Sequence, residues 1–97
     1  MTNYVILIGR ITKIGTLEDN KSIITIAVTR NYKNEEGVYD TDFVDVTLIN
    51  GIAENVNEYC KIGDLVGIKG MVRNESSSLS IVAEKVTFLS TGRKENE

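Results

Sequence analysis

Apolar and polar residues alternate with a period of two along most of the chain, which is the pattern of β-strands. In the first such run, residues 5–11, both faces are apolar, because Ile6 and Ile8 lie opposite Leu7. We therefore expect this strand to be covered on both sides, with another subunit on one of them. Gly9 inside the run predicts a bulge or a sharp bend, which curls a sheet toward closure.

The same period predicts four further strands, over residues 23–32, 39–49, 65–73 and 79–89. In the third strand, one face is apolar and belongs to the core: Val44, Val46 and Leu48. The other face mixes an aromatic ring, a charge and branched side chains, which is unusual for plain solvent exposure: Phe43, Asp45, Thr47 and Ile49. Polar segments predict the connections, which are a turn at 18–21, a loop at 33–37 and a five-residue loop at 74–78.

One short helix is predicted between the third and fourth strands. Asn50 and Gly51 can begin it, and Ile52, Val56 and Tyr59 follow at the spacing of one helical face. Three strands, a helix and two strands are the element order of the OB-fold, an all-β five-stranded Greek-key barrel. An open β-sandwich and an SH3-like barrel are the alternatives. We expect one domain over residues 1–90 and a short polar tail over 91–97.

Composition excludes several classes of function. The 97 residues include no histidine and one cysteine, Cys60, so a histidine-based catalytic triad, a zinc site and an internal disulfide are not expected. We predict a binding protein without catalytic activity, cofactor or metal, and we interpret Cys60 as a small buried apolar residue. The chain has no apolar run long enough to span a membrane.

The charges are unevenly distributed. The net charge of −3 argues against a uniformly basic nucleic-acid binder. However, the acidic residues lie mainly in predicted loops, the helix and the tail, whereas six basic residues lie on or beside predicted strands: Arg10, Lys13, Arg30, Lys33, Lys69 and Arg73. These six could line a groove that binds phosphates, or they could be ordinary solvated surface residues. Asp45 is the exception among the acids, and we expect it to pair with a neighbouring Arg or Lys.

Several segments together resemble the bacterial and phage single-stranded DNA-binding proteins. They are Asn3-x-Val5-x-Leu7-x-Gly9-Arg10, residues 41–46, Ala53-Glu54, Tyr59 and Lys61-x-Gly63-Asp64 with the strand that follows it. The resemblance implies an OB-fold that binds single-stranded DNA without strong sequence preference, usually as a homotetramer, with a dimer as the other possibility. It also implies stacking of bases at three positions, which are Tyr32, Phe43 and Ile49 here.

Three departures from that family stand out. Ile49 offers apolar contact in place of a ring, and the loop at 74–78 lacks a further aromatic residue. The chain ends in Arg93-Lys94-Glu95-Asn96-Glu97 without the acidic, apolar tip that recruits other enzymes, so we do not expect that recruitment. We therefore predict weaker binding than is usual for the family.

The other aromatic residues have more ordinary interpretations. We expect Phe88 in the core, Tyr4 and Tyr59 in structural positions, and Tyr39 as a cross-strand partner or a further stacking ring. Phe43 could also form a subunit contact. The sequence as a whole favours a cytoplasmic, nucleoid-associated protein of bacterial, phage or mobile-element origin that coats single strands in replication, repair and recombination. The alternative is an OB domain that binds another protein.

Overall fold

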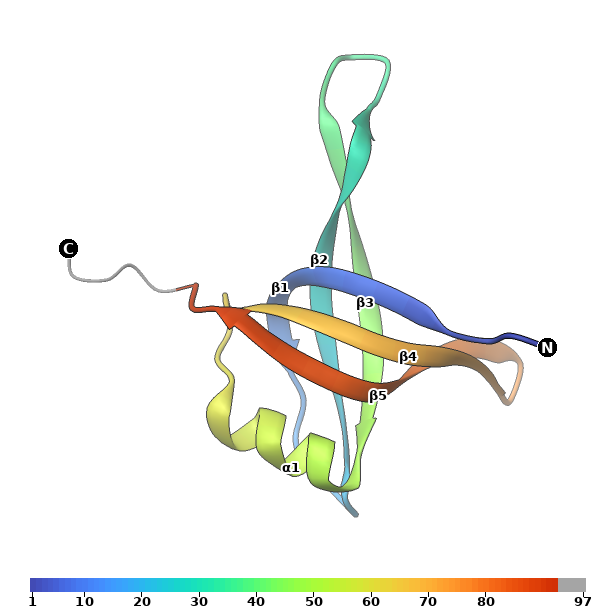
Figure 1. Cartoon of the computed structure of the whole chain (residues 1–97), viewed down its shortest axis with the longest axis vertical. Helices are drawn as coiled ribbons and strands as arrows, with labels where there is room; N and C mark the ends of the chain where they lie inside the picture. Colours follow the sequence, from blue (N-terminus) through green and yellow to red (C-terminus); the bar gives the residue numbers. More distant parts are fainter. Residues whose placement is uncertain (93–97) are drawn as a thin grey trace.

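The computed structural model describes residues 1–92, which form five strands and one helix (Figure 1). The elements, in chain order, are β1 (Val5–Ile14), β2 (Lys21–Lys33), β3 (Tyr39–Ile49), α1 (Asn50–Tyr59), β4 (Leu65–Glu75) and β5 (Ser78–Ser90). The strands close into a barrel in the order β1-β2-β3-β5-β4, with β3 and β5 parallel and the other neighbours antiparallel. The predicted OB-fold and its element order are confirmed. The predicted tail falls mostly outside the described residues.

Strand β1 closes the barrel because it pairs with two partners. Residues 5–10 pair with β4, and the strand then pairs with β2 from Arg10 onward. Gly9 lies where the strand changes partner, and a Cβ atom there would lie 2.5 Å from the backbone oxygen of Ala27. Glycine is needed for this close approach. The bulge itself falls slightly later than predicted, between Ile11 and Lys13.

The barrel interior is filled by the inward-facing side chains of alternate strand positions. These fully buried residues include Ile11, Ile24, Ile26, Val46, Leu48, Val66 and Ile68. Helix α1 adds Ala53 and Val56 to the same cluster and covers one end of the barrel (Figure 1). Burying one such side chain stabilises the fold by about 1.5–3 kcal/mol, so this cluster is the main source of stability.

The motif Lys61-x-Gly63-Asp64 joins α1 to β4. Gly63 adopts φ 99°, which is accessible chiefly to glycine, and its N–H donates to the Ile11 oxygen at 2.7 Å. The carboxylate of Asp64, which is 1% exposed, accepts from the backbone N–H groups of Lys61 at 2.8 Å and Gly92 at 3.2 Å. One buried acid therefore ties the beginning of β4 to the segment that follows β5.

Two connections are tight turns. Glu18 and Lys21 exchange backbone hydrogen bonds of 2.9 Å, and the two residues between them, Asp19 and Asn20, have positive φ, as a type I′ turn requires. The predicted five-residue loop at 74–78 is too long. β4 and β5 continue their pairing up to a turn of only Ser76 and Ser77, because polar side chains are compatible with an exposed strand end.

The β2–β3 hairpin extends well beyond the barrel (Figure 1). We call its outer part, residues 28–42, the arm, because these residues pair only with one another. At its tip, the side-chain oxygen of Asn34 accepts from the backbone N–H groups of Glu36 at 2.8 Å and Val38 at 3.0 Å. A register shift between Thr29 and Lys33 leaves β2 with two more residues than β3 in this stretch. The arm is therefore an ordered projection with its own hydrogen-bonded tip.

The predicted core position of Phe88 is wrong, and Tyr59, expected in a structural position, is largely exposed. Tyr59 is 69% exposed and Phe88 is 54% exposed. Both line a groove between α1 and β5, together with Val56, Cys60 and Val86. The alternation places Phe88 on the inward side of β5, opposite Val66. At this end of the barrel, however, the wall is covered only by a ten-residue helix, whose buried residues are Ala53 and Val56.

Candidate nucleic-acid interface

The outward face of the β2–β3 hairpin carries three of the nine predicted binding residues, Lys33, Phe43 and Ile49. Its cross-strand pairs are Lys33 with Tyr39, Ala27 with Phe43, Thr25 with Asp45, and Lys21 with Ile49. Strand β1 adds Arg10 beside Ala27 and Lys13 beside Thr25. We call this row the outer strip and define it by Arg10, Lys13, Lys21, Lys33, Tyr39, Phe43 and Ile49. It runs from the tip of the arm to the end of β3.

The bulge in β1 is what brings Arg10 and Lys13 to the same face. In a regular strand, residues 10 and 13 point to opposite sides. The register shift between Ile11 and Lys13 makes Lys13 the partner of the outward-facing Thr25, while Ile11 stays in the core opposite Ile26. Arg10 is also fixed at its far end, where Nη1 donates to the Gly63 oxygen at 3.0 Å. The guanidinium has further N–H groups with which to contact a ligand.

Phe43 is the most open ring of the strip. It is 68% exposed, and its cross-strand partner is Ala27, whose small side chain leaves the ring face uncovered. Tyr39, nearer the tip, is 51% exposed, and the Nζ atom of Lys33 lies 5.8 Å from its ring centre. Tyr39 is thus a cross-strand partner, as one of its two interpretations predicted. An exposed ring beside cations is the combination that binds a base and its phosphate.

Ile49 and Arg73 come together although they lie far apart in the sequence. Ile49, at the end of β3, is 38% exposed and borders a hollow between the start of α1 and strands β4 and β5. Arg73 lines the same hollow, together with Met71, Val82 and Glu84. The hollow therefore adjoins the strip at the end of β3, and its charged lining residues are Arg73 and Glu84.

Arg30 and Tyr32 do not lie on the strip. Arg30 is on the opposite face of the arm, where its Nε and Nη2 atoms donate to the two carboxylate oxygens of Asp42 at 3.0 and 2.9 Å. This hydrogen bonding raises the pKa of Arg30 and lowers the pKa of Asp42, and Tyr32 is close enough to add to the effect on Arg30. Tyr32 is 60% exposed, so its ring is accessible from that side.

Lys69 lies on a different wall of the barrel. It pairs with Ile6 of β1 and Lys85 of β5, and its Nζ atom is 5.8 Å from the ring centre of Tyr4. Tyr4 is 58% exposed. Six of the nine predicted site residues are thus brought into one continuous surface, while Arg30, Tyr32 and Lys69 are not.

Lys21 belongs to the strip but was not predicted, because it lies in the segment interpreted as a turn. Its pairing with Ile49 follows from the register of the β2–β3 hairpin. A correct position for the tight turn at 19–20 would have shown that β2 begins at Lys21. Asp45 forms no ion pair among the described residues, so the expectation that it pairs with an Arg or Lys is wrong. Its Oδ1 atom instead accepts from the hydroxyl of Thr25 at 2.7 Å, because Thr25 is its direct cross-strand partner.

An apolar patch covers the outward face of β1 and the neighbouring strands. Ile6 is 65% exposed, Ile8 57% and Leu89 45%. Gly67 lies between them, since a Cβ atom there would be 4.0 Å from Ile8 Cγ1 and 3.7 Å from Leu89 Cδ1. We call these residues the β1–β4 patch. It is the second apolar face that the sequence predicted for the first strand.

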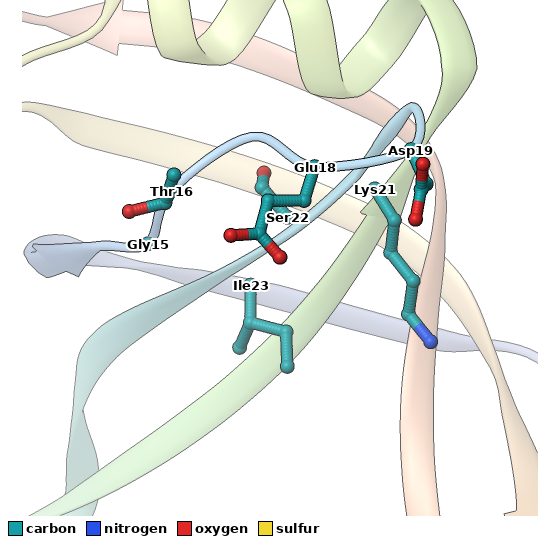
Figure 2. A pocket seen from close by; sticks show the side chains of 7 residues that line it. All are labelled: Gly15, Thr16, Glu18, Asp19, Lys21, Ser22 and Ile23. Carbon is teal, nitrogen blue, oxygen red and sulfur yellow. The ribbon is translucent and has the colours of Figure 1, made fainter.

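Other surfaces offer little for chemistry. A shallow hollow beside the β1–β2 turn is lined by Glu18, Asp19 and Lys21 together with small or apolar residues (Figure 2). No cluster of three or more metal-ligating side chains occurs within residues 1–92. Cys60 is half-buried, and burial, with a smaller effect of Asp64, raises the pKa of its thiol, which disfavours the reactive thiolate. Within residues 1–92, the one helix is not long and apolar enough to cross a membrane.

Comparison with known proteins identifies the family. Residues 2–89 match the model of the single-strand binding protein family. The single-stranded DNA-binding protein 1 of Clostridium acetobutylicum is 36% identical over 107 aligned residues, covering 95% of this chain and 97% of that protein. The single-stranded DNA-binding protein B of Bacillus subtilis is 38% identical over 81 residues, covering 78% of this chain and 72% of the relative.

Solved structures agree on the fold. A small single-stranded DNA-binding protein from Mycoplasma pneumoniae superimposes with a TM-score of 0.72 at 21% identity, covering 100% of this chain and 99% of the other. The mitochondrial single-stranded DNA-binding protein Rim1 of Saccharomyces cerevisiae gives a TM-score of 0.73 at 24% identity, covering 95% and 100%. The family match agrees with the expectation of a binding protein that does not catalyse a reaction. The chain belongs to the single-strand binding protein family.

Proposed function

We propose that this protein binds single-stranded DNA without strong sequence preference along the outer strip. The observation that carries the proposal is the open ring of Phe43, 68% exposed and flanked across the sheet by Arg10, in a chain of the single-strand binding protein family. An exposed ring accepts any base, because every base has a stacking face. Cations along the same row then contact the phosphates.

The acidic net charge does not oppose this function, because charge distribution decides where a strand can dock. Four basic residues lie on the strip, and Asp45 is the acid among them: Arg10, Lys13, Lys21 and Lys33. Ile49 and the hollow beside Arg73 extend the path for a strand past β3. Tyr32 adds a second ring surface on the other side of the arm.

In this role the protein coats exposed strands, prevents them from pairing again and protects them during replication, repair and recombination. That substrate would place it with the nucleoid in a bacterial cytoplasm. None of the comparisons favours the alternative of an OB domain that binds another protein.

The β1–β4 patch supports self-association. A row of half-exposed isoleucines beside a glycine gives a flat apolar surface, which a second copy of the chain can cover by two-fold symmetry. We propose a homo-oligomer, with a tetramer favoured and a dimer possible. Light scattering at micromolar concentration tests it: the expected mass is a multiple of the monomer, and Ile6→Glu/Ile8→Glu should reduce it. A monomeric mass for the wild-type chain would contradict the proposal.

A titration of fluorescent oligo-dT at several salt concentrations tests the binding function. If the four strip cations each neutralise one phosphate, log K should fall with log salt at a slope of about −2.8. The matched control is Glu58→Gln, which changes one exposed charge on α1 and should leave the slope unchanged. Absence of binding at low salt, or an affinity indifferent to salt, would refute the function.

A further inference from the structure

Arg30 is held by two carboxylates and not by one. Its Nε and Nη2 atoms form the paired hydrogen bonds to Asp42 at 3.0 and 2.9 Å, and its Nη1 atom lies 3.6 Å from Oδ2 of Asp40. Asp40 is itself oriented by Asn34, whose Nδ2 atom donates to its Oδ1 atom at 3.2 Å. The two-pronged contact to one carboxylate is the strongest arrangement that a guanidinium makes at a protein surface.

A phosphate uses the same guanidinium N–H groups as a carboxylate does. In this arrangement, Asp42 occupies the Nε–Nη2 edge of Arg30, and Asp40 lies beside Nη1 of the other edge that could hold a phosphate by two hydrogen bonds. The local charge is also unfavourable, because one cation faces two acids on this side of the arm. On the opposite side of the arm, the ammonium group of Lys33 lies beside the ring of Tyr39.

We infer that Asp42, supported by Asp40, sets the DNA affinity by withholding Arg30 from phosphates. This inference rests on the proposed function. It makes the two sides of the arm unequal: phosphates are bound on the side of Phe43 and Lys33, while the other side offers the ring of Tyr32 and a cation that contributes nothing to phosphate binding. Asp42 thereby lowers the affinity and its salt dependence, since each additional phosphate contact would make the complex tighter and more dependent on salt.

The test is the salt dependence of oligo-dT binding for Asp42→Asn and for Asp40→Asn/Asp42→Asn. Asparagine keeps the shape of aspartate but not its charge, and the double variant removes both partners of Arg30. If Arg30 then reaches one phosphate, the slope of log K against log salt should steepen by about 0.7. A tenfold dilution of salt should therefore raise the affinity of the variant about fivefold more than it raises the affinity of the wild type. Adding Arg30→Gln to the double variant should restore the wild-type slope.

Glu58→Gln is the control for the change in net charge, because it also removes one negative charge but lies on α1. Circular dichroism establishes that each variant is folded. The inference is overturned if neither the single nor the double variant has a steeper slope than Glu58→Gln, or if Arg30→Gln fails to reverse the change.

A second measurement separates this inference from the proposed function. Heparin–agarose is a polyanion that reports accessible cations whether or not the chain binds DNA. We expect Asp42→Asn to elute at a higher salt concentration than Glu58→Gln, and equal elution would count against the masking of Arg30. A wild-type chain that does not bind oligo-dT would refute the proposed function, while the heparin result would still decide whether Asp42 masks Arg30.

Discussion

Replacing Phe43 with alanine should separate binding from stability. A base stacked on an aromatic ring contributes about 1–3 kcal/mol, so Phe43→Ala should weaken oligo-dT binding by roughly 5- to 150-fold. The ring is 68% exposed, so only about a third of a buried side chain's 1.5–3 kcal/mol is lost from the folded state. That is about 0.5–1 kcal/mol, equivalent to a fall in Tm of a few degrees for a chain of this size.

The assay is fluorescence anisotropy of labelled oligo-dT at several salt concentrations, with thermal unfolding by circular dichroism in parallel. Because the ring carries no charge, the slope of log K against log salt should stay the same while the curve moves to weaker binding. Phe88→Ala is the matched control, since Phe88 is a half-exposed ring outside the strip. If Phe43→Ala binds as tightly as the wild type, or if Phe88→Ala weakens binding equally, Phe43 is not a stacking residue.

Three further predictions concern other parts of the molecule. Ile49→Phe should tighten oligo-dT binding by about 1–3 kcal/mol, because it adds a ring where the strip adjoins the hollow, and an unchanged Kd would contradict this. Gly9→Ala should destabilise the fold by at least about 1–3 kcal/mol in urea unfolding, because its Cβ atom would lie 2.5 Å from the Ala27 oxygen. Cys60 should be alkylated more slowly at pH 8 in the folded chain than in urea, because burial raises the pKa of its thiol above 9.0. Equal alkylation rates would contradict the burial of Cys60. Because the pKa of the thiol is higher in the folded chain, the stability that it contributes is present below pH 9 and is lost as the pH rises through the folded-state pKa.

Much of the fold was predictable because it depends on local pattern. The period-two alternation identified all five strands and the core face of the third, where Val46 and Leu48 are fully buried as expected. The single helix and its place between β3 and β4 followed from spacing. The exposure of Phe43 also followed from alternation alone, since its neighbours on the opposite face belong to the core. These features depend on the alternating direction of side chains along a regular strand. The order of residues is therefore enough to predict them.

The composition of the site depended on tertiary structure. The bulge after Ile11 turned Lys13 to the same face as Arg10, and no feature of the alternation located it. The hairpin register brought Lys21 to Ile49, and barrel closure brought Arg73 to the same hollow. Arg30 carries the same formal charge as Arg10, yet it faces two acids across the arm.

Sequence alone therefore determined the type of barrel, its core and the presence of an exposed ring among cations. The tertiary structure decided which cations share a surface with that ring and which are held elsewhere. The physical reason is that alternation is set within one strand, whereas a binding surface is built across several. Its members depend on register, bulges and the ion pairs formed between strands that are distant in the chain.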